Sequence, residues 1–409
     1  MHNIAGCSRR ACARCILRSK VHVANGVCQR SRGRSDLPKC RTEAAETGGL
    51  TGTTMGDGYI RNAWYVAAWH HELSGGAERR PLARTLLGAP VVLFRQADGT
   101  PAALEDRCPH RRMPLSMGTV VGDTLQCGYH GFTLDGSGRC VRIPGQDSIP
   151  EAARVRAYPV VEKWRWIWIW PGDPALADES LIPDVALNGH PDWAVTEGDP
   201  LHVAGHYQLV VDNLMDGSHV SFVHKSTLGT DDVADIPVRA ERDGDRVRMT
   251  RWILDRPPAP IYAALGGFEG NVDRWQIITF APPSMVVVDM GSAAAGTGAP
   301  EGDRSRGVEL RSFNLITPET DRTCFYFYTH VRNFSLTDAG VDRRVRDLFR
   351  EAFLEDKVVV EGVQRGDERF PDSPRVDAAF DRAPTMARRV VERLARQEAV
   401  PDSRVAAAG

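Results

Sequence analysis

Two short segments of the chain each pair a cysteine with a histidine. Cys108 and His110 are separated by one residue, Cys127 and His130 by two, and sixteen residues lie between His110 and Cys127. Each segment offers one thiolate and one imidazole to a metal centre. The spacing predicts a two-iron, two-sulfide cluster in which the cysteines bind one iron and the histidines bind the other.

A cluster with these ligands is a Rieske cluster, which transfers single electrons. Its reduction potential exceeds that of an all-cysteine cluster because two neutral imidazoles replace two thiolates. Structural zinc is the main alternative, but such sites usually take two cysteines from one segment and two histidines from another. Arg111, Arg112 and Gly131 follow the two pairs and permit loops. We therefore expect both pairs at loop tips.

A second metal site is suggested by His219 and His224, which are five residues apart, with Asp216 three residues before the first. Three residues make about one helical turn, so Asp216 could accept a hydrogen bond from the ring nitrogen of His219 that faces away from a metal. On a regular helix the two histidines would lie roughly 140° apart. They converge only if the helix is distorted or ends between them. Packed or surface histidines are the alternative, and the upstream Cys/His pairs favour metal.

A ferrous site that activates dioxygen requires a carboxylate beside two histidines. Between residues 345 and 363 apolar side chains recur at steps of three and four, as on the inner face of an amphipathic helix. Asp356 falls on this stripe, where an ionised carboxylate is costly unless it is paired or binds metal. A salt bridge to an arginine is the alternative explanation. The stripe consists of Val345, Phe349, Ala352, Phe353, Val359, Val360 and Val363, and the rival ligands are Glu355, Asp231, Asp232 and Asp235.

The first part of the fold is expected to be all β. Residues 58–172 alternate short β-like runs with turns, which is typical of a small antiparallel domain. We expect the run from Lys163 to Trp170 to be one strand with four tryptophans on one face. A Pro-Gly-Asp-Pro break at 171–174 ends this domain.

The second part is expected to combine an antiparallel sheet with helices. After the histidine segment come five strand-like runs and then the Asp356 helix, and the Gly- and Ala-rich residues 291–307 are expected to form a mobile loop. The predicted fold class is therefore α+β. An all-β Rieske [2Fe–2S] domain over 58–172 is followed by a catalytic domain over 173–400 that holds mononuclear iron.

The sequence resembles the Rieske non-haem iron oxygenases, and within them the oxygenase components of vanillate O-demethylases. The resemblance covers most of the chain. Its metal-ligand motifs define the wider family, whereas the VDRWQ and FAPPS segments at 272–276 and 280–284 resemble the aromatic O-demethylase branch. The other similar stretches are 62–67, 168–173, 212–216, 316–320, 332–334 and 355–357.

The resemblance implies the site and its cofactors. It assigns one Rieske cluster to the two Cys/His pairs and one mononuclear Fe(II) to His219, His224 and Asp356. Asp216 would bridge to a Rieske histidine of a neighbouring subunit in a homotrimer. Asn213 matches an asparagine found near the iron in this branch.

The resemblance also implies the reaction. A reductase partner carrying flavin and iron–sulfur groups would draw on NADH, and a methoxylated aromatic acid would react with O2. Hydroxylation of the methoxy carbon would give a phenol and formaldehyde. Hydroxylation of a ring or of another substituent is the alternative, and an electron carrier without oxygenase activity is a further one. Arg251, Arg274 and His330 could each bind a substrate carboxylate or be structural.

Composition narrows the partners and the location. The 409 residues, 42% hydrophobic and 25% charged, can bury a large core and form two domains. A formal net charge of −2 gives no sign of nucleic-acid binding. No apolar run approaches the roughly 20 residues that cross a membrane. Free thiols at Cys140 and Cys324 suit a bacterial cytoplasm.

The first 54 residues differ from the rest. They hold ten Lys or Arg against three Asp or Glu, a balance of +7, which leaves −9 for residues 55–409. Five of the nine cysteines also lie there. The resemblance begins just after Met55, so we expect an upstream extension, disordered if translated, that reflects a mis-chosen start codon.

Overall fold

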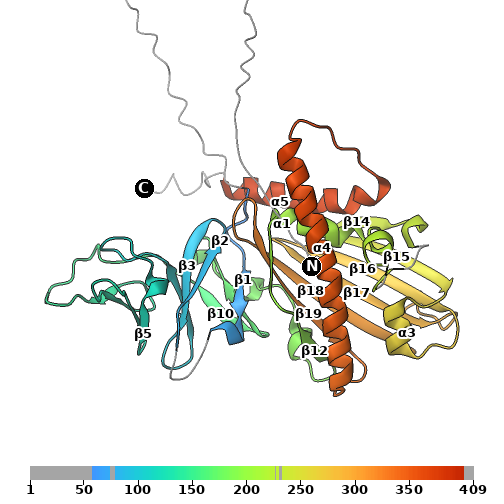
Figure 1. The fold of residues 1–409 in the computed structure, drawn as a ribbon, viewed down its shortest axis with the longest axis horizontal. Helices are drawn as coiled ribbons and strands as arrows, with labels where there is room; N and C mark the ends of the chain where they lie inside the picture. Colours follow the sequence, from blue (N-terminus) through green and yellow to red (C-terminus); the bar gives the residue numbers. More distant parts are fainter. Residues whose placement is uncertain (1–57, 74–78, 226, 230–232, 400–409) are drawn as a thin grey trace, which may run out of the picture. The chain divides into compact units, whose positions relative to one another are not determined.

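The computed structural model describes residues 58–73, 79–225, 227–229 and 233–399. The expectation for residues 1–54 therefore lies outside the described part of the chain. The predicted α+β class is confirmed: small antiparallel sheets come first, and a large antiparallel sheet with helices follows (Figure 1).

Three small antiparallel sheets form the first part. Their strand orders are β1-β11-β10, β2-β3-β4-β9 and β5-β6-β7-β8. The strands are β1 (Tyr65–Trp69), β2 (Leu82–Leu86), β3 (Ala89–Arg95), β4 (Pro101–Glu105), β5 (Thr119–Val121), β6 (Thr124–Gln126), β7 (Thr133–Leu134), β8 (Cys140–Arg142), β9 (Ala157–Tyr158), β10 (Val160–Lys163) and β11 (Trp166–Ile169).

The expected single strand from Lys163 to Trp170 is wrong. Trp164 and Arg165 have φ values of 51° and 76°, so they form a two-residue turn that joins β10 to β11 as a hairpin. Trp166 and Trp168 pack in one core cluster, while Ile167 and Ile169 pack in another on the opposite face. β11 is buried on both faces, which explains its continuous apolar sequence.

A single large antiparallel sheet dominates the second part, with the order β12-β19-β18-β17-β16-β15-β14 and with β13 also pairing to β19. β17 runs to Ala294 and β18 begins at Gly307, so the first residues of the expected loop 291–307 belong to a strand. The strands are β12 (Ala194–Glu197), β13 (Leu201–Val203), β14 (Arg239–Asp243), β15 (Arg246–Arg256), β16 (Val272–Ala281), β17 (Met285–Ala294), β18 (Gly307–Pro318) and β19 (Cys324–Arg332).

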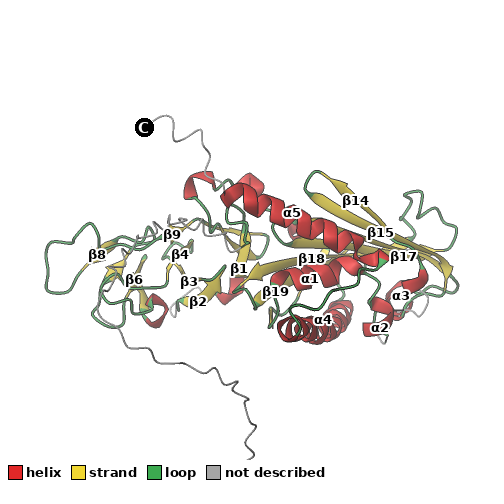
Figure 2. Ribbon diagram, turned by 90° about the horizontal axis from the view of Figure 1, so that it is seen from above, coloured by secondary structure: helices red, strands yellow, loops and turns green. Residues whose placement is uncertain are grey.

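Helices α1, α4 and α5 lie together on one side of this sheet (Figure 2). The α-helices in the described part of the chain are α1 (Tyr207–Asp216), α2 (Val220–Val223), α3 (Pro260–Gly266), α4 (Ala339–Arg369) and α5 (Arg382–Ala399). Short 3-10 turns occur at His70–Glu72, Leu115–Met117, Pro174–Leu176, Glu179–Leu181, Ala186–Gly189, Val233–Asp235 and Ala379–Asp381.

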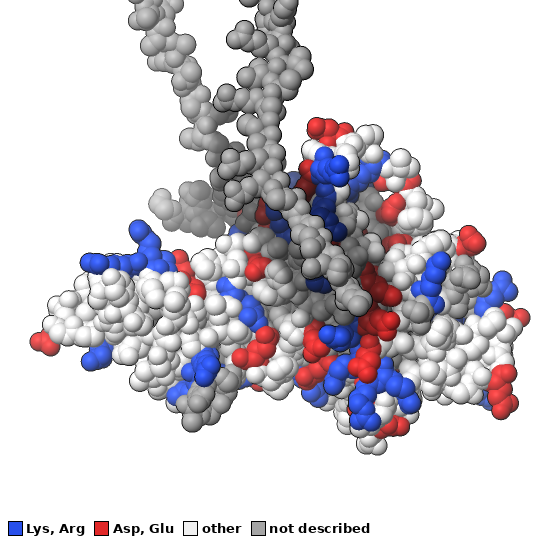
Figure 3. All heavy atoms as spheres, in the orientation of Figure 1, with Lys and Arg blue, Asp and Glu red and all other residues white. Residues whose placement is uncertain are grey.

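α4 carries the predicted apolar stripe, but fewer of its side chains are buried than the sequence predicts. Val345, Phe349, Phe353 and Asp356 are buried, as predicted. Val359 and Val363 are instead 38% and 43% exposed, because they border an open cavity beside α1. Acidic and basic side chains are interspersed on the face drawn in Figure 3, which includes α4.

Hydrogen bonds join the first part of the fold to the large sheet. Thr317 Oγ1 donates to Val66 O at 2.7 Å, and Leu87 N donates to Pro318 O at 2.8 Å. The described residues from 58 onward form one compact unit, so the division between 172 and 173 stays a prediction. Among the described residues, no helix is both long and apolar enough to cross a membrane.

The sheet core leaves no room for a side chain at Gly291. A Cβ there would lie 2.1 Å from Trp275 Cζ2 and 2.4 Å from Val308 O, whereas one at Gly270 would meet nothing within 4 Å. We expect Gly291→Ala to lower the free energy of unfolding by roughly 1–3 kcal/mol, since overpacking strains a close-packed core. Gly270→Ala is the matched control. Thermal unfolding followed by circular dichroism measures both, and equal melting temperatures would contradict the packing argument.

Candidate functional site

Equivalent loops present the two Cys/His pairs. Cys108 N donates to Met113 O at 2.7 Å, and Cys127 N donates to Phe132 O at 2.8 Å. Each loop also has a left-handed residue four positions after its cysteine, Arg112 with φ 61° and Gly131 with φ 71°. The backbone therefore turns around each sulfur in the same way.

The side chains on these loops match the donor set of a Rieske cluster. Cys108 and Cys127 are each 2% exposed, while His110 and His130 are exposed, with ring centroids 4.6 Å apart. Burial and the neighbouring Cys127 thiol raise the pKa of Cys108. Two buried thiolates therefore need a cation beside them, and cluster iron would be that cation.

A break between α1 and α2 brings His219 and His224 together. α1 ends at Asp216, Gly217 adopts φ 65°, and the two histidines cap the ends of the four-residue α2. Their ring centroids are 5.3 Å apart. The regular helix that would have separated them does not exist, because the left-handed glycine ends α1 before His219.

The two histidines and Asp356 converge on one point. Nε2 of His219 and Nε2 of His224 lie 3.4 Å and 3.1 Å from Oδ1 of Asp356. Among the described residues, these three form a group whose ligand atoms lie within 4.8 Å of one another. Two imidazoles and one carboxylate are the donor set of a ferrous oxygenase site, so the residues fit mononuclear iron.

In both histidines, the ring nitrogen that faces away from the centre contacts a carboxylate. His219 Nδ1 lies 3.2 Å from Asp216 Oδ2, and His224 Nδ1 lies 2.7 Å from Glu355 Oε2. Because a carboxylate accepts, each Nδ1 carries the proton and each Nε2 faces the centre. Glu355, a rival ligand on sequence grounds, thus lies behind His224. Asp235 lies outside the group of three, and Asp231 and Asp232 lie outside the described residues.

The charges of this group also favour a cation. Burial lowers the pKa of His219, but hydrogen bonds to Asp216 and Asp356 outweigh burial and raise it to about 9. Burial raises the pKa of Asp356, but hydrogen bonds from His219 and His224 lower it well below its usual range. Without a metal, protonated imidazole holds the group of His219, His224 and Asp356 together. A divalent cation would replace those protons.

The neighbouring residues of α1 are fixed by other helices. Asn213 Nδ2 donates to Asp356 Oδ1 at 3.1 Å, so its amide supports the carboxylate. Asp212 accepts from Arg388 Nε of α5 at 2.7 Å. These contacts set how α1 presents Asp216.

Arg251 fastens the break between α1 and α2. Its Nη1 donates to Gly217 O at 2.9 Å, and its Nη2 donates to Ser218 Oγ at 2.7 Å. Its Nε donates to Ile236 O at 3.0 Å. Arg251 is thus engaged in positioning this segment, a role that the sequence did not reveal because its partners are backbone and hydroxyl groups.

A mainly apolar cavity of about 70 Å³ adjoins the three candidate ligands. It contains Arg274 but neither Arg251 nor His330. His330 stacks on Phe349 at 3.7 Å, and burial lowers its pKa to about 3. The apolar lining includes Leu214, Leu228, Ile278, Val288, Phe349 and Phe353, and the polar lining includes Tyr262, Arg274, Gln276 and Ser312.

A second, more open cavity borders Asp216. Asp216 lines this second cavity together with Val359 and Val363 of α4, and Asp216 does not line the first. His219 lines both. None of the four Cys/His pair residues lines either cavity.

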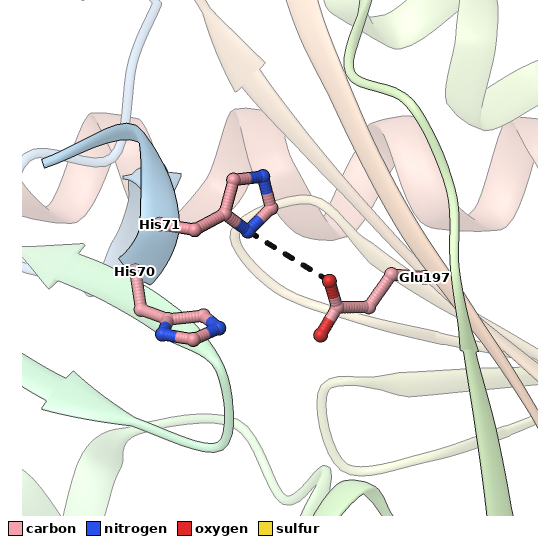
Figure 4. Close-up of side chains that lie close together, drawn as sticks. All are labelled: His70, His71 and Glu197. Atoms are coloured by element: carbon pink, nitrogen blue, oxygen red, sulfur yellow. Dashed lines mark ion pairs between the residues drawn. The ribbon is translucent and has the colours of Figure 1, made fainter. Parts of the chain in front are cut away.

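The structure also gathers His70, His71 and Glu197 (Figure 4). His71 Nδ1 lies 3.7 Å from Glu197 Oε2, while Arg165 Nη1 lies 2.7 Å from Glu197 Oε1. His71 is exposed and the carboxylate already has an arginine partner. We regard this group as a surface ion-pair cluster.

Comparison with known proteins gives the family. Residues 63–159 match the Rieske [2Fe-2S] domain, and residues 203–397 match the vanillate O-demethylase oxygenase C-terminal domain. A putative toluene-4-sulfonate monooxygenase system iron-sulfur subunit, TsaM2 of Comamonas testosteroni, is 42% identical over 83% of this chain and 98% of its own length. The chain belongs to the Rieske-type oxygenases. The predicted family and enzyme class are confirmed.

Two further similarities support this membership. The oxygenase component of dicamba O-demethylase from Stenotrophomonas maltophilia is 39% identical to this Rieske oxygenase over 83% of the chain and 99% of that protein. The crystal structure of dicamba monooxygenase bound to 3,6 dichlorosalicylic acid matches with a TM-score of 0.78 and 36% identity, over 84% of this chain and 99% of that one.

Glu355 gives a test of the mononuclear centre. We expect Glu355→Gln to weaken ferrous binding about 10- to 100-fold, because the amide orients the His224 ring less strongly than the carboxylate does. Iron retained per chain against a competing chelator measures this. Glu351→Gln, an exposed position one turn earlier on α4, is the matched control. The cluster absorbance should stay unchanged in both, and equal iron retention would contradict the role of Glu355.

Proposed function

We propose that this Rieske oxygenase is the oxygenase component of an aromatic O-demethylase. It would hydroxylate the methoxy carbon of an aromatic substrate, and the product would collapse to a phenol and formaldehyde. The observation that carries the proposal is the apolar cavity bordered by His219, His224 and Asp356. The match to a vanillate O-demethylase domain and the likeness to dicamba O-demethylase support this reaction.

Hydroxylation of an aromatic ring or of another substituent is the second candidate. It is favoured by the toluene-4-sulfonate monooxygenase relative, whose 42% identity exceeds the 39% of the dicamba enzyme. Both reactions use the same ligands. They differ in which carbon of the substrate the cavity presents to the metal.

In this proposal each residue of the candidate site has its own role. Bound at their sites, a Rieske cluster would supply single electrons and a ferrous ion would activate dioxygen. Asp216 and Glu355 accept hydrogen bonds from Nδ1 of the two histidines and so hold the proton on that nitrogen. Asn213 donates a hydrogen bond to Asp356. The apolar cavity walls exclude water from the reacting groups.

Electron entry is proposed to occur from the second cavity. Asp216 borders that cavity, and the exposed His110 or His130 of a neighbouring copy would approach it there. The rim also exposes Val376, at 94%, beside Val359 and Val363, as a protein-binding surface would. A homotrimer in which each cluster serves the next subunit satisfies these conditions.

The source of electrons is proposed to be a separate reductase with flavin and iron–sulfur groups that oxidises NADH. The dicamba relative is an oxygenase component, which supports a separate reductase as the partner. We further propose a bacterial cytoplasm as the location, where disulfides are rare, because Cys140 and Cys324 are free and buried.

Turnover tests the reaction. Iron-loaded protein, a Rieske-oxygenase reductase and NADH would be combined with methoxylated and unmethoxylated aromatic acids. We expect formaldehyde in proportion to the NADH and oxygen consumed with a methoxylated acid such as vanillate. A hydroxylated product without formaldehyde would favour the second candidate. No substrate-dependent oxygen uptake despite a reducible cluster would reject both.

Asp216→Asn tests electron entry. With iron in excess, we expect both metal sites to stay loaded and the reductase still to reduce the cluster, while product formation falls about 10- to 100-fold, because the amide no longer presents an ionised carboxylate between the second cavity and His219. Cluster reduction by EPR and product by chromatography separate the two steps. Asp377→Asn, which removes an exposed carboxylate from the same cavity, is the control. Full turnover by Asp216→Asn would refute the assignment.

A further inference from the structure

We propose that Arg274 binds the anionic group of the substrate, and that the substrate is therefore an aryl carboxylate or aryl sulfonate. This inference rests on the proposed function, because it concerns the cavity next to the candidate ferrous site. It assigns to one residue the recognition of charge in that cavity.

Arg274 lies inside the cavity on a rigid element. Arg274, Gln276 and Ile278 alternate along β16, and all three line the cavity because every second side chain of a strand faces the same way. Arg274 is 5% exposed. Its guanidinium is therefore held in a fixed, dry place, as a recognition group must be.

The guanidinium has donors to spare. Nη2 donates to Leu228 O at 3.0 Å, and Cζ lies 5.2 Å from the centre of the Tyr262 ring. Among the residues that the structure describes, Nε and Nη1 have no hydrogen-bond partner. With one N–H on Nε and two on Nη1, three of the five N–H donors are unused.

Arg274 also lacks a counter-ion among the residues that the structure describes. Two other buried arginines of the same sheet have partners for their donors, and one of the two has a counter-ion. Arg332 pairs with Asp342 at 2.5 Å, and all three nitrogens of Arg251 donate to oxygen atoms. An unpaired buried charge is unfavourable. Arg274 thus lines the cavity with unused donors on its guanidinium, and in this proposal an incoming anion would complete their hydrogen bonding.

Arginine suits this class of ligand. Its planar guanidinium donates two parallel hydrogen bonds to a carboxylate and accommodates other oxyanions in the same way. The apolar side chains of Leu228, Val288 and Met290 line the same cavity and would contact an aromatic ring. The combination selects a ring with one anionic substituent over a neutral ring.

The position of Arg274 also sets the orientation of the ligand. Gln276 contacts Arg251 Nη1 at 3.4 Å, and the same Nη1 binds Gly217 next to the candidate ligands. Arg274 comes two residues before Gln276 on β16, about 7 Å away along the strand. The ring of a ligand held by Arg274 would extend from there toward Gln276 and the candidate metal ligands, which line the same cavity.

Binding measured without electrons tests this inference separately from the reaction. Purified, iron-loaded protein would be titrated calorimetrically with 4-methoxybenzoate, toluene-4-sulfonate and the neutral 4-methoxybenzamide. We expect at least one anion to bind about 10- to 100-fold more tightly than the amide, since hydrogen bonds to a charged group are the stronger ones. The two anions distinguish carboxylate from sulfonate recognition.

Variants identify the residue. Arg274→Gln should abolish the preference for the anion, and Arg274→Lys should retain part of it, because the charge remains and the planar pair of donors is lost. Arg248→Gln removes an exposed arginine of β15 that does not line the cavity, and it should bind as the unmodified protein does. No anion preference in the unmodified protein, or a preference that survives Arg274→Gln, would overturn the proposal.

Thermal unfolding separates recognition from a structural role. Arg274→Met removes a buried unpaired charge, so the ligand-free melting temperature should stay the same or rise. The rise in melting temperature caused by the anion should disappear. A large fall in the ligand-free value with the anion-induced rise intact would show that Arg274 is structural. Failure of O-demethylation in the turnover assay would leave these binding results unaffected.

Discussion

The site depends on one buried carboxylate oxygen. Oδ1 of Asp356 is the point on which His219 Nε2, His224 Nε2 and Asn213 Nδ2 converge. These donors come from α1, the break after it, and the end of α2, whereas Asp356 comes from α4. A buried charge must be compensated. The compensation draws three separate segments into one arrangement that a divalent cation can enter.

The rest of the fold serves to hold those segments at fixed positions. The large sheet supplies Arg251, which fastens the break at Gly217, and α5 supplies Arg388, which fixes α1 through Asp212. Glu355 precedes Asp356 on α4, so one helix provides both a candidate ligand and the group that orients His224. Displacement of α4 would therefore disturb two contacts of the centre together.

The candidate ligands could be predicted from the sequence because each motif lies within a short stretch of the chain. Two Cys/His pairs have a recognisable spacing, and Asp356 is conspicuous on an apolar stripe. Sequence reasoning missed the supporting roles of Glu355 and Arg251, because their partners lie far away along the chain and only the fold brings them together. It also missed the turn at Trp164 and Arg165, where two bulky residues adopt the positive φ values that glycine and asparagine usually provide.

The candidate site adjoins two spaces of different character. One is the mainly apolar cavity with Arg274, and the other is the open cavity with Asp216. His219 lines both of these spaces. A ligand that displaced this imidazole from within the inner space would also disturb its 3.2 Å contact with Asp216, which lines the outer space.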